Sequence, residues 1–262
     1  MKQLIQVKCS SRLSEVVFSD DEYKQIRSFP GELPELIQFL SSYSPFIKRL
    51  ICNELEWLSG EIYKELDQIL TEIIEDCKHK IQIDTFPAIR IAKRRAILVI
   101  AIADFGKILG LTEVTNALSL FAEGVVELVM DLYTFKEFQR VDYRPLLKNL
   151  NSYPKRIHRS AHKTGLCSLG MGKLGSRELN YSSDIDLIFL FDEEKYKPEH
   201  YSRIRNVFIS IVRKIVKALS EVTAEGYVFR VDLRLRPDPS TNPICIGAMA
   251  ALRYYENFGG DF

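Results

Sequence analysis

Apolar and polar positions follow the period of an α-helix through the first 155 residues. Ser44-Pro45 predicts a helix start, because a capping residue followed by proline suits the first helical turn. The amphipathic stretch that follows reaches Leu58, and Gly60 is expected to interrupt it. A second helix is expected from Glu61 to about Lys80.

Two longer helices are predicted next. Pro87 is expected to open a helix whose centre, Ala96 to Ala103, is apolar on nearly every side and should be buried. Thr112 is expected to cap the following helix, which runs towards Arg140 with apolar residues at helical spacing. We therefore predict a helical region over residues 1–155.

The pattern changes after this point. GLCSLG, bounded by glycines, predicts a strand; MGKLGS predicts a turn; and IDLIFLFD is a nearly continuous apolar run, typical of a central strand. One apolar helical stripe runs from Tyr201 to Thr223, and YVFRVDLRLRP then alternates with period two. A mixed sheet with helices is predicted over 156–262. The fold class as a whole is α+β, a helical region followed by this sheet unit.

Composition narrows the class of protein. Of 262 residues, 46% are hydrophobic and 27% charged, which is ordinary for a globular protein, and the net charge of +1 disfavours binding to nucleic acid or membranes through bulk charge. The five cysteines form no C-x-x-C pair, which favours reduced thiols. The run Ala96–Ala103 is far short of the ~20 apolar residues of a membrane span. We expect a cytoplasmic protein.

The sharpest candidate chemistry is the D-x-D of Asp184 and Asp186. Side chains alternate along a strand, so both carboxylates should project from one face, about 7 Å apart. Two ionised carboxylates repel each other, and a divalent cation such as Mg²⁺ would relieve that repulsion. The alternative is that Asp184 caps a turn and Asp186 is a solvated strand end.

The last predicted strand places Arg230, Asp232, Arg234 and Arg236 on one face. Beside the D-x-D strand, Asp232 would be a third metal carboxylate and the arginines would bind phosphate. Two cations about 3.5–4 Å apart would then stabilise the attacking and leaving oxygens of an in-line displacement at phosphorus. The alternative is an ordinary charged strand on a solvent face.

The glycine-rich turn supplies candidate phosphate contacts. Gly175 and Ser176 would let backbone N–H groups approach a phosphate, with a short helix expected after Ser176 to point its positive end at it. Lys173 is a further candidate, although an exposed turn lysine is equally expected, and Ser183 belongs to the same candidate set. The turn matches neither a Walker A loop nor G-x-G-x-x-G.

Gly175-Ser176 followed by D-x-D and a later acid resembles the DNA polymerase beta nucleotidyltransferase superfamily. The longer string GMGKLGSRELNYSSDIDLIFLFD, with VDLRLRPDPSTNP after it, closely resembles the bifunctional glutamine synthetase adenylyltransferase/adenylyl-removing enzymes. SPFIKRLI and RRAILVIAIADFGKILGLTEVTNALSLFAE resemble that family's leading helices. Helices preceding the motif are similar to the N-terminal, adenylyl-removing half. By resemblance, Asp184, Asp186 and Asp232 would be the catalytic, metal-binding carboxylates, and Gly175-Ser176 the phosphate turn.

The resemblance implies an activity and its partners. The adenylyl-removing half takes AMP from a tyrosine of glutamine synthetase by Mg²⁺-dependent phosphorolysis and releases ADP, as part of nitrogen assimilation control. Glutamine synthetase, phosphate, an adenine nucleotide and a PII-type regulatory protein are the implied partners. The family's second half and further helices of the first are missing, so we expect the 156–262 domain to be C-terminally incomplete. Two alternatives stay open: an ATP-dependent adenylyltransferase acting on glutamine synthetase, and a truncated, non-catalytic binding module.

Overall fold

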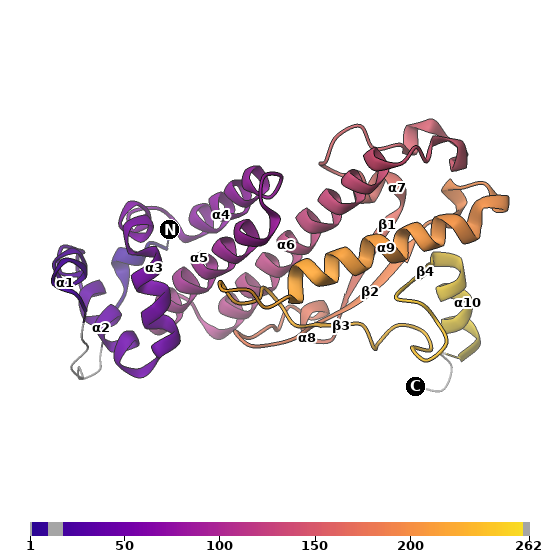
Figure 1. The fold of residues 1–262 in the computed structure, drawn as a ribbon. Helices are drawn as coiled ribbons and strands as arrows, with labels where there is room; N and C mark the ends of the chain where they lie inside the picture. The colour runs from indigo at the N-terminus through magenta and orange to yellow at the C-terminus, as the bar shows by residue number, and fades with distance from the viewer. Residues whose placement is uncertain (1, 10–17, 259–262) are drawn as a thin grey trace.

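The computed structural model describes residues 2–9 and 18–258 as an elongated body, with helices at the N-terminal end and a small sheet at the other (Figure 1). The α-helices are α1 (Asp20–Arg27), α2 (Leu33–Tyr43), α3 (Pro45–Glu61), α4 (Leu66–Lys80), α5 (Thr85–Phe105), α6 (Leu111–Arg140), α7 (Ser160–Thr164), α8 (Gly172–Gly175), α9 (Tyr201–Ser220) and α10 (Ala248–Phe258). The strands are β1 (Leu166–Met171), β2 (Ile185–Phe191), β3 (Val231–Asp232) and β4 (Cys245–Gly247). The predicted α+β fold class is confirmed.

Local capping explains where the first helices begin and end. The start of α3 is confirmed: the Ser44 hydroxyl accepts a hydrogen bond from the Ile47 N–H at 3.2 Å, and Pro45 occupies the first turn. The break predicted at Gly60 is confirmed to within one residue, since α3 ends at Glu61. The second helix begins at Leu66 and not at the predicted Glu61, because residues 62–65 form the turn between the two helices.

Helices α5 and α6 run side by side through the centre of the molecule (Figure 1). The predicted burial of α5 is confirmed, since every residue from Ala96 to Ala103 is at most 5% exposed. The predicted Thr112 cap is wrong. Helix α6 begins at Leu111, and the Glu113 carboxylate caps it by accepting from the Gly110 N–H at 2.9 Å.

The sheet is built around β2, which pairs antiparallel with β1 from Asp186 to Phe191. Its other edge pairs in parallel with β3 at Ile185–Asp186 and with β4 at Phe189–Phe191. The central-strand prediction for β2 is therefore confirmed. The last predicted strand is much shorter than its alternating pattern, because β3 ends at Asp232.

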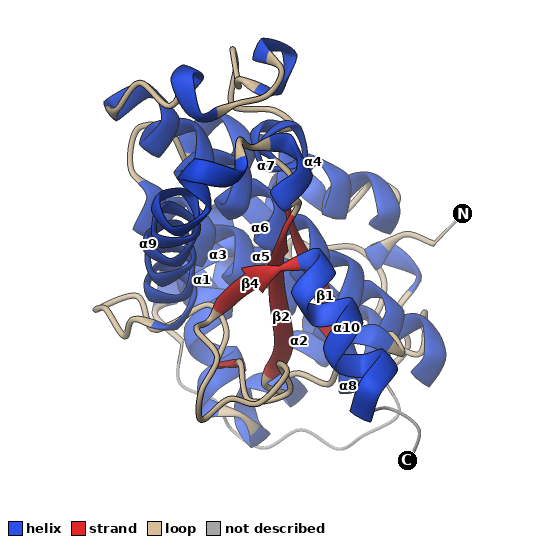
Figure 2. Ribbon diagram, turned by 90° about the vertical axis from the view of Figure 1, so that its right-hand side faces the viewer, coloured by secondary structure: helices blue, strands red, loops and turns tan. Residues whose placement is uncertain are grey.

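Helices cover the sheet from both sides: α9 lies to one side of the strands and α10 to the other (Figure 2). The predicted apolar stripe of α9 is buried from Ile204 to Leu219. Val222, the last residue of the predicted stripe, is 75% exposed because the helix ends at Ser220. The sheet is thus held against α6 through α9.

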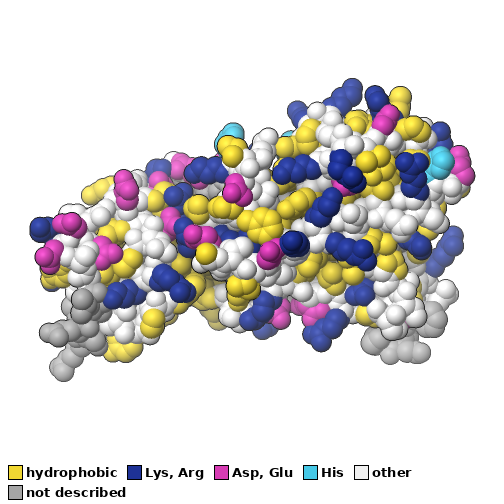
Figure 3. Space-filling model, in the orientation of Figure 1, with side chains coloured by type: hydrophobic (Ala, Val, Ile, Leu, Met, Phe, Trp, Pro, Cys, Tyr) yellow, Lys and Arg dark blue, Asp and Glu magenta, His cyan; other side chains and the backbone are white. Residues whose placement is uncertain are grey.

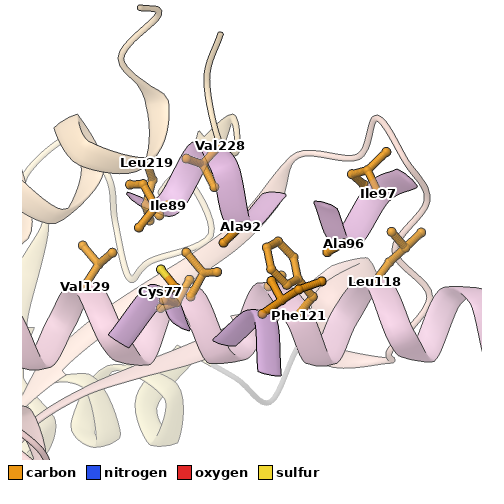
Figure 4. Packing of buried hydrophobic residues seen from close by; sticks show 14 of the residues in the cluster. Cys77, Ile89, Ala92, Ala96, Ile97, Leu118, Phe121, Val129, Leu219 and Val228 are labelled. Carbon is orange, nitrogen blue, oxygen red and sulfur yellow. The ribbon is translucent and has the colours of Figure 1, made fainter. Parts of the chain in front are cut away.

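One continuous apolar core joins the helices to the sheet. It includes Ile89 and Ala92 of α5, Phe121 of α6, Leu219 of α9 and Val228 ahead of β3, which lie together in Figure 4. The predicted boundary between a helical region and a sheet domain at residue 155 stays a prediction. The apolar core contains residues from both sides of this boundary.

Two buried carboxylates on α6 tie this core together. Asp131 accepts from the backbone N–H groups of Arg159 at 2.7 Å and Ala161 at 2.9 Å, and so caps α7. Glu137, 3% exposed, accepts from Arg140 at 2.6 Å and from Lys214 of α9 at 2.7 Å. Although burial raises the pKa of Glu137, these two cations lower it to about 2.

Charged side chains cover much of the surface, and on the face in Figure 3 the basic ones gather towards the end that holds the sheet. Within residues 2–9 and 18–258, no helix has the length and apolar character needed to cross a membrane.

We expect Glu137→Gln to destabilise the fold by about 1–3 kcal/mol at neutral pH, because it uncouples α6 from Lys214. The folded pKa lies below the ordinary 4.5, so this contribution is complete above pH 4.5 and is lost as the pH falls towards 2. Urea unfolding at several pH values measures it. The exposed Glu127→Gln on the same helix is the control and should change the free energy of unfolding little. Equal stability of Glu137→Gln and wild type at pH 7 would contradict the prediction.

Candidate active site

The parallel pairing of β2 with β3 brings two of the candidate carboxylates together. Asp186 lies directly opposite Asp232 and Ile185 opposite Val231, and the Ile185 N–H donates to the Arg230 carbonyl at 2.9 Å. Residues opposite each other on neighbouring strands point to the same face, so the two carboxylates project together. Asp184 lies just ahead of β2, near enough for its charge to act on the Asp186 carboxyl.

The charges of the three acids act on one another. Burial raises the pKa of Asp186, and the negative charges of Asp232 and Asp184 raise it further. Arg234 and Lys173 act in the opposite direction on the same carboxyl. Asp186 therefore sits at the centre of a cluster in which negative charge is concentrated and only partly balanced.

Two of the predicted arginines belong to this cluster. Arg230 donates to the Asp184 carboxylate and to the Ser182 carbonyl at 2.6 Å. Arg234 donates through Nε and Nη2 to Asp232 Oδ2, at 2.8 and 2.5 Å, and lowers the pKa of Asp232. Both guanidiniums reach solvent, with Arg234 85% exposed, so they lie where an anionic substrate can contact them.

Arg236 does not join them. Its guanidinium donates to the carbonyls of Leu233 at 2.7 Å and Pro239 at 2.9 Å, and so holds the loop after β3. The predicted alternation ends early because the Asp232 carboxylate accepts from the Arg234 backbone N–H at 2.8 Å, which turns the chain out of the strand.

The turn after β1 meets the carboxylates from the other side. Lys173 is exposed at its tip. Gly172, which the sequence analysis did not single out, has φ +52°, and a Cβ atom there would lie 2.7 Å from Asp186 Oδ2. Only glycine lets the backbone approach this carboxylate so closely. The sequence did offer a sign of this role, because Gly172 directly precedes Lys173 within the glycine-rich turn MGKLGS.

The expected helix after Ser176 is wrong in position. The short helix α8 precedes Ser176, whose hydroxyl donates back to the Gly172 carbonyl at 3.1 Å. Gly175 is needed for packing, since a Cβ atom there would lie 2.6 Å from the Gly170 carbonyl oxygen. The Ser183 hydroxyl accepts from the Asn180 N–H at 3.3 Å, in the loop that leads to Asp184. Phosphate binding by these three residues stays a prediction.

The donor set suits a hard divalent cation. Among residues 2–9 and 18–258, no three His, Cys, Asp or Glu side chains form a ready-made metal cage. Mg²⁺, however, is ordinarily held by one or two carboxylates together with water and substrate phosphate oxygens, and Asp186 and Asp232 form such a pair. Burial is the largest cause of the raised pKa of Asp186, and the repulsion by Asp232 and Asp184 that adds to it is one that a cation would relieve.

Comparison with known proteins identifies the family. Residues 24–262 match the family model described as glutamate-ammonia ligase adenylyltransferase. The chain belongs to this family. The resemblance to the bifunctional glutamine synthetase adenylyltransferase/adenylyl-removing enzymes is thereby confirmed.

Three relatives carry that bifunctional name. The protein of Agrobacterium fabrum is 34% identical over 241 residues, which are 87% of this chain and 23% of the relative, and that of Bartonella henselae is 35% identical over 240 residues, with the same shares. The protein of Rhizobium meliloti is 39% identical over 171 residues, 65% of this chain and 16% of the relative. The chain thus spans less than a quarter of the length of these relatives.

We expect Gly172→Ala to reduce nucleotidyl transfer at least about 10-fold, because the methyl group displaces the Asp186 carboxylate. Steady-state rates measure this, with thermal unfolding alongside. Gly226→Ala is the matched control: Gly226 also has positive φ, +86°, but a Cβ atom there has nothing within 4 Å. Both variants should lose a similar, small amount of stability from backbone strain. Equal rates for the two variants would show that the approach of Gly172 to Asp186 is irrelevant to catalysis.

Proposed function

We propose that this chain removes AMP from a tyrosine of adenylylated glutamine synthetase by phosphorolysis and releases ADP. The observation that carries the proposal is the register of β2 and β3, which places Asp186 opposite Asp232 beside two solvent-exposed arginines. The names of the relatives supply the protein substrate. The helices that precede the motif resemble those of the family's N-terminal half, which favours the adenylyl-removing activity.

The reaction is an in-line displacement at phosphorus. Hydrogen phosphate attacks the AMP phosphorus, the bond from phosphorus to the tyrosine oxygen breaks, and the proton of the attacking phosphate passes to that oxygen. The products are ADP and the unmodified tyrosine hydroxyl of glutamine synthetase, so atoms and charge balance. Little covalent chemistry is asked of the protein, and catalysis depends on positioning and electrostatic stabilisation.

The residues of the site match these needs. Asp186 and Asp232 would hold Mg²⁺, which when bound offsets the negative charge of the phosphate groups, whereas the Asp184 carboxylate is held by Arg230. Arg230, Arg234 and the exposed Lys173 add positive charge at the same place and orient the anionic reactants. Gly172 keeps the turn close to Asp186, which leaves Lys173 at the mouth of the site.

Asp186→Asn should lower the rate of ADP release at least about 100-fold, because one charged ligand is lost and the fold is kept. The assay supplies AMP-modified glutamine synthetase, phosphate and Mg²⁺. Asp192→Asn, at the far end of the same strand, is the control and should retain the wild-type rate, because asparagine also caps the turn there. An unchanged rate in Asp186→Asn would remove this site from the mechanism.

Two other functions are tested by the same preparation. An ATP-dependent adenylyltransferase would transfer label from ATP to unmodified glutamine synthetase, and we expect no such labelling. A non-catalytic binding module would show no ADP release. Calorimetry with Mg²⁺ and nucleotide distinguishes the two cases. An intact catalytic site should bind both, whereas a site that has lost its function should bind neither.

A further inference from the structure

The backbone between α9 and β3 is irregular yet firmly held. A turn joins Thr223 to Gly226 through hydrogen bonds of 3.0 and 2.9 Å, and the N–H groups of Val228 and Phe229 donate to the Leu219 carbonyl at 3.0 and 2.9 Å. This segment delivers Arg230 and Asp232 to the active site. Strand β3 itself pairs over only two residues, so its own ladder fixes its position weakly.

Helix α5 reaches this segment with a buried arginine. Arg90 is 1% exposed and donates to the carbonyls of Gly226 at 2.8 Å and Ala218 at 3.4 Å, and also to that of Glu221. These carbonyls belong to the end of α9 and the turn beyond it. Arg90 therefore fixes where the chain leaves α9.

Lys93, one turn further along α5, holds the next residues. Its ammonium donates to the carbonyl of Val228 and to that of Tyr227 at 3.4 Å. It lies 4.7 Å from the ring centre of Tyr227 and 5.3 Å from that of Phe229. Burial of the Val228 side chain against Ile89 and Ala92 completes the attachment (Figure 4).

We propose that Arg90 and Lys93 are positioning residues for catalysis, and that together they form an α5 clamp that holds Asp232 in register with Asp186. The proposal rests on the proposed phosphorolytic function. It assigns to the helical region a direct part in the geometry of the active site. A shift of about 1 Å at a reacting centre can cost on the order of 100-fold in rate, so a loosened clamp should be visible in kcat.

The charges around Lys93 give the clamp a pH dependence. Burial lowers the pKa of Lys93 to about 8, with Arg230 and Arg90 adding to the effect. Arg94 also faces this region but is paired with Glu54 and Glu225. Arg49, Tyr181 and Tyr227 line the same cavity, and the Tyr181 hydroxyl donates to Asp104 at 3.0 Å. The lysine is therefore charged below pH 8 and neutral above it, where its hydrogen bonds to carbonyls weaken.

The first test is kinetic and uses the full chain. We expect Lys93→Met to lower kcat about 10- to 100-fold with little change in the KM for inorganic phosphate, and Lys93→Arg to recover much of the rate. The wild-type kcat should fall as the pH rises through 8, while the Lys93→Met profile should show no such step. Lys136→Met, an exposed lysine on α6, is the control and should behave as wild type. A Lys93→Met enzyme with wild-type kcat, or with an unaltered pH profile, would overturn the proposal.

The second test reads the strand pairing without any activity. The Ile185 N–H bonds to the Arg230 carbonyl, so its hydrogen exchange reports on β2 and β3, whereas the Asp192 N–H bonds to Gly165 on the β1 side. Lys93→Met should speed exchange at Ile185 and leave Asp192 protected. If the Ile185 amide were equally protected in the wild type and in Lys93→Met, the clamp would be refuted. If Ile185 and Asp192 lost protection equally in the variant, Lys93 would contribute only to the overall stability of the fold and the clamp would also be refuted. A wild-type chain that releases no ADP would defeat the proposed function while leaving this measurement decisive for the clamp.

Discussion

The candidate active site depends on a short parallel pairing in which two residues of β2 lie against two residues of β3. Ile185 and Asp186 lie against Val231 and Asp232, and this register alone decides that two carboxylates face the same way. A slip of one residue would turn Asp232 to the opposite face of the sheet. So short a ladder cannot supply that precision by itself, and the surrounding structure has to provide it.

A strand ladder on one side and the packed helices on the other supply the missing rigidity. On one side, the long antiparallel ladder with β1 fixes β2, and the turn at Gly172 continues from that ladder to touch Asp186. On the other side, the buried apolar faces of α5, α6 and α9 meet in one core that includes Val228. Asp186 and Asp232 are half-buried and the two arginines beside them reach solvent, while the backbone that presents them is held by strand pairing and by the core.

Much of this arrangement was accessible from the sequence, and the physical reason is that it is local. The alternation of Asp184, Ile185 and Asp186 fixes which side chains share a face, and the apolar centre of α5 requires burial. The placement of Arg236 could not be obtained this way. The alternating pattern predicts a strand through Arg236, but the Asp232 carboxylate accepts a hydrogen bond from the Arg234 backbone N–H and ends the strand, which no alternation of residue types reveals. Strand β4 is only three residues long and has no pattern of its own. The contact between Lys93 and Val228 joins residues 135 positions apart, which no local pattern encodes.

The continuity of the core bears on how this protein can be divided. The pattern of apolar and polar residues changes near residue 155, yet α6 makes contacts across this point. It packs against the inner face of α9, and its Asp131 caps the start of α7. Excising residues 156–262 would strip an apolar helix face of its cover and leave buried polar ends without partners. Residues 156–262 therefore share their core with α5 and α6, and engineered fusions or swaps should carry both helices with the sheet.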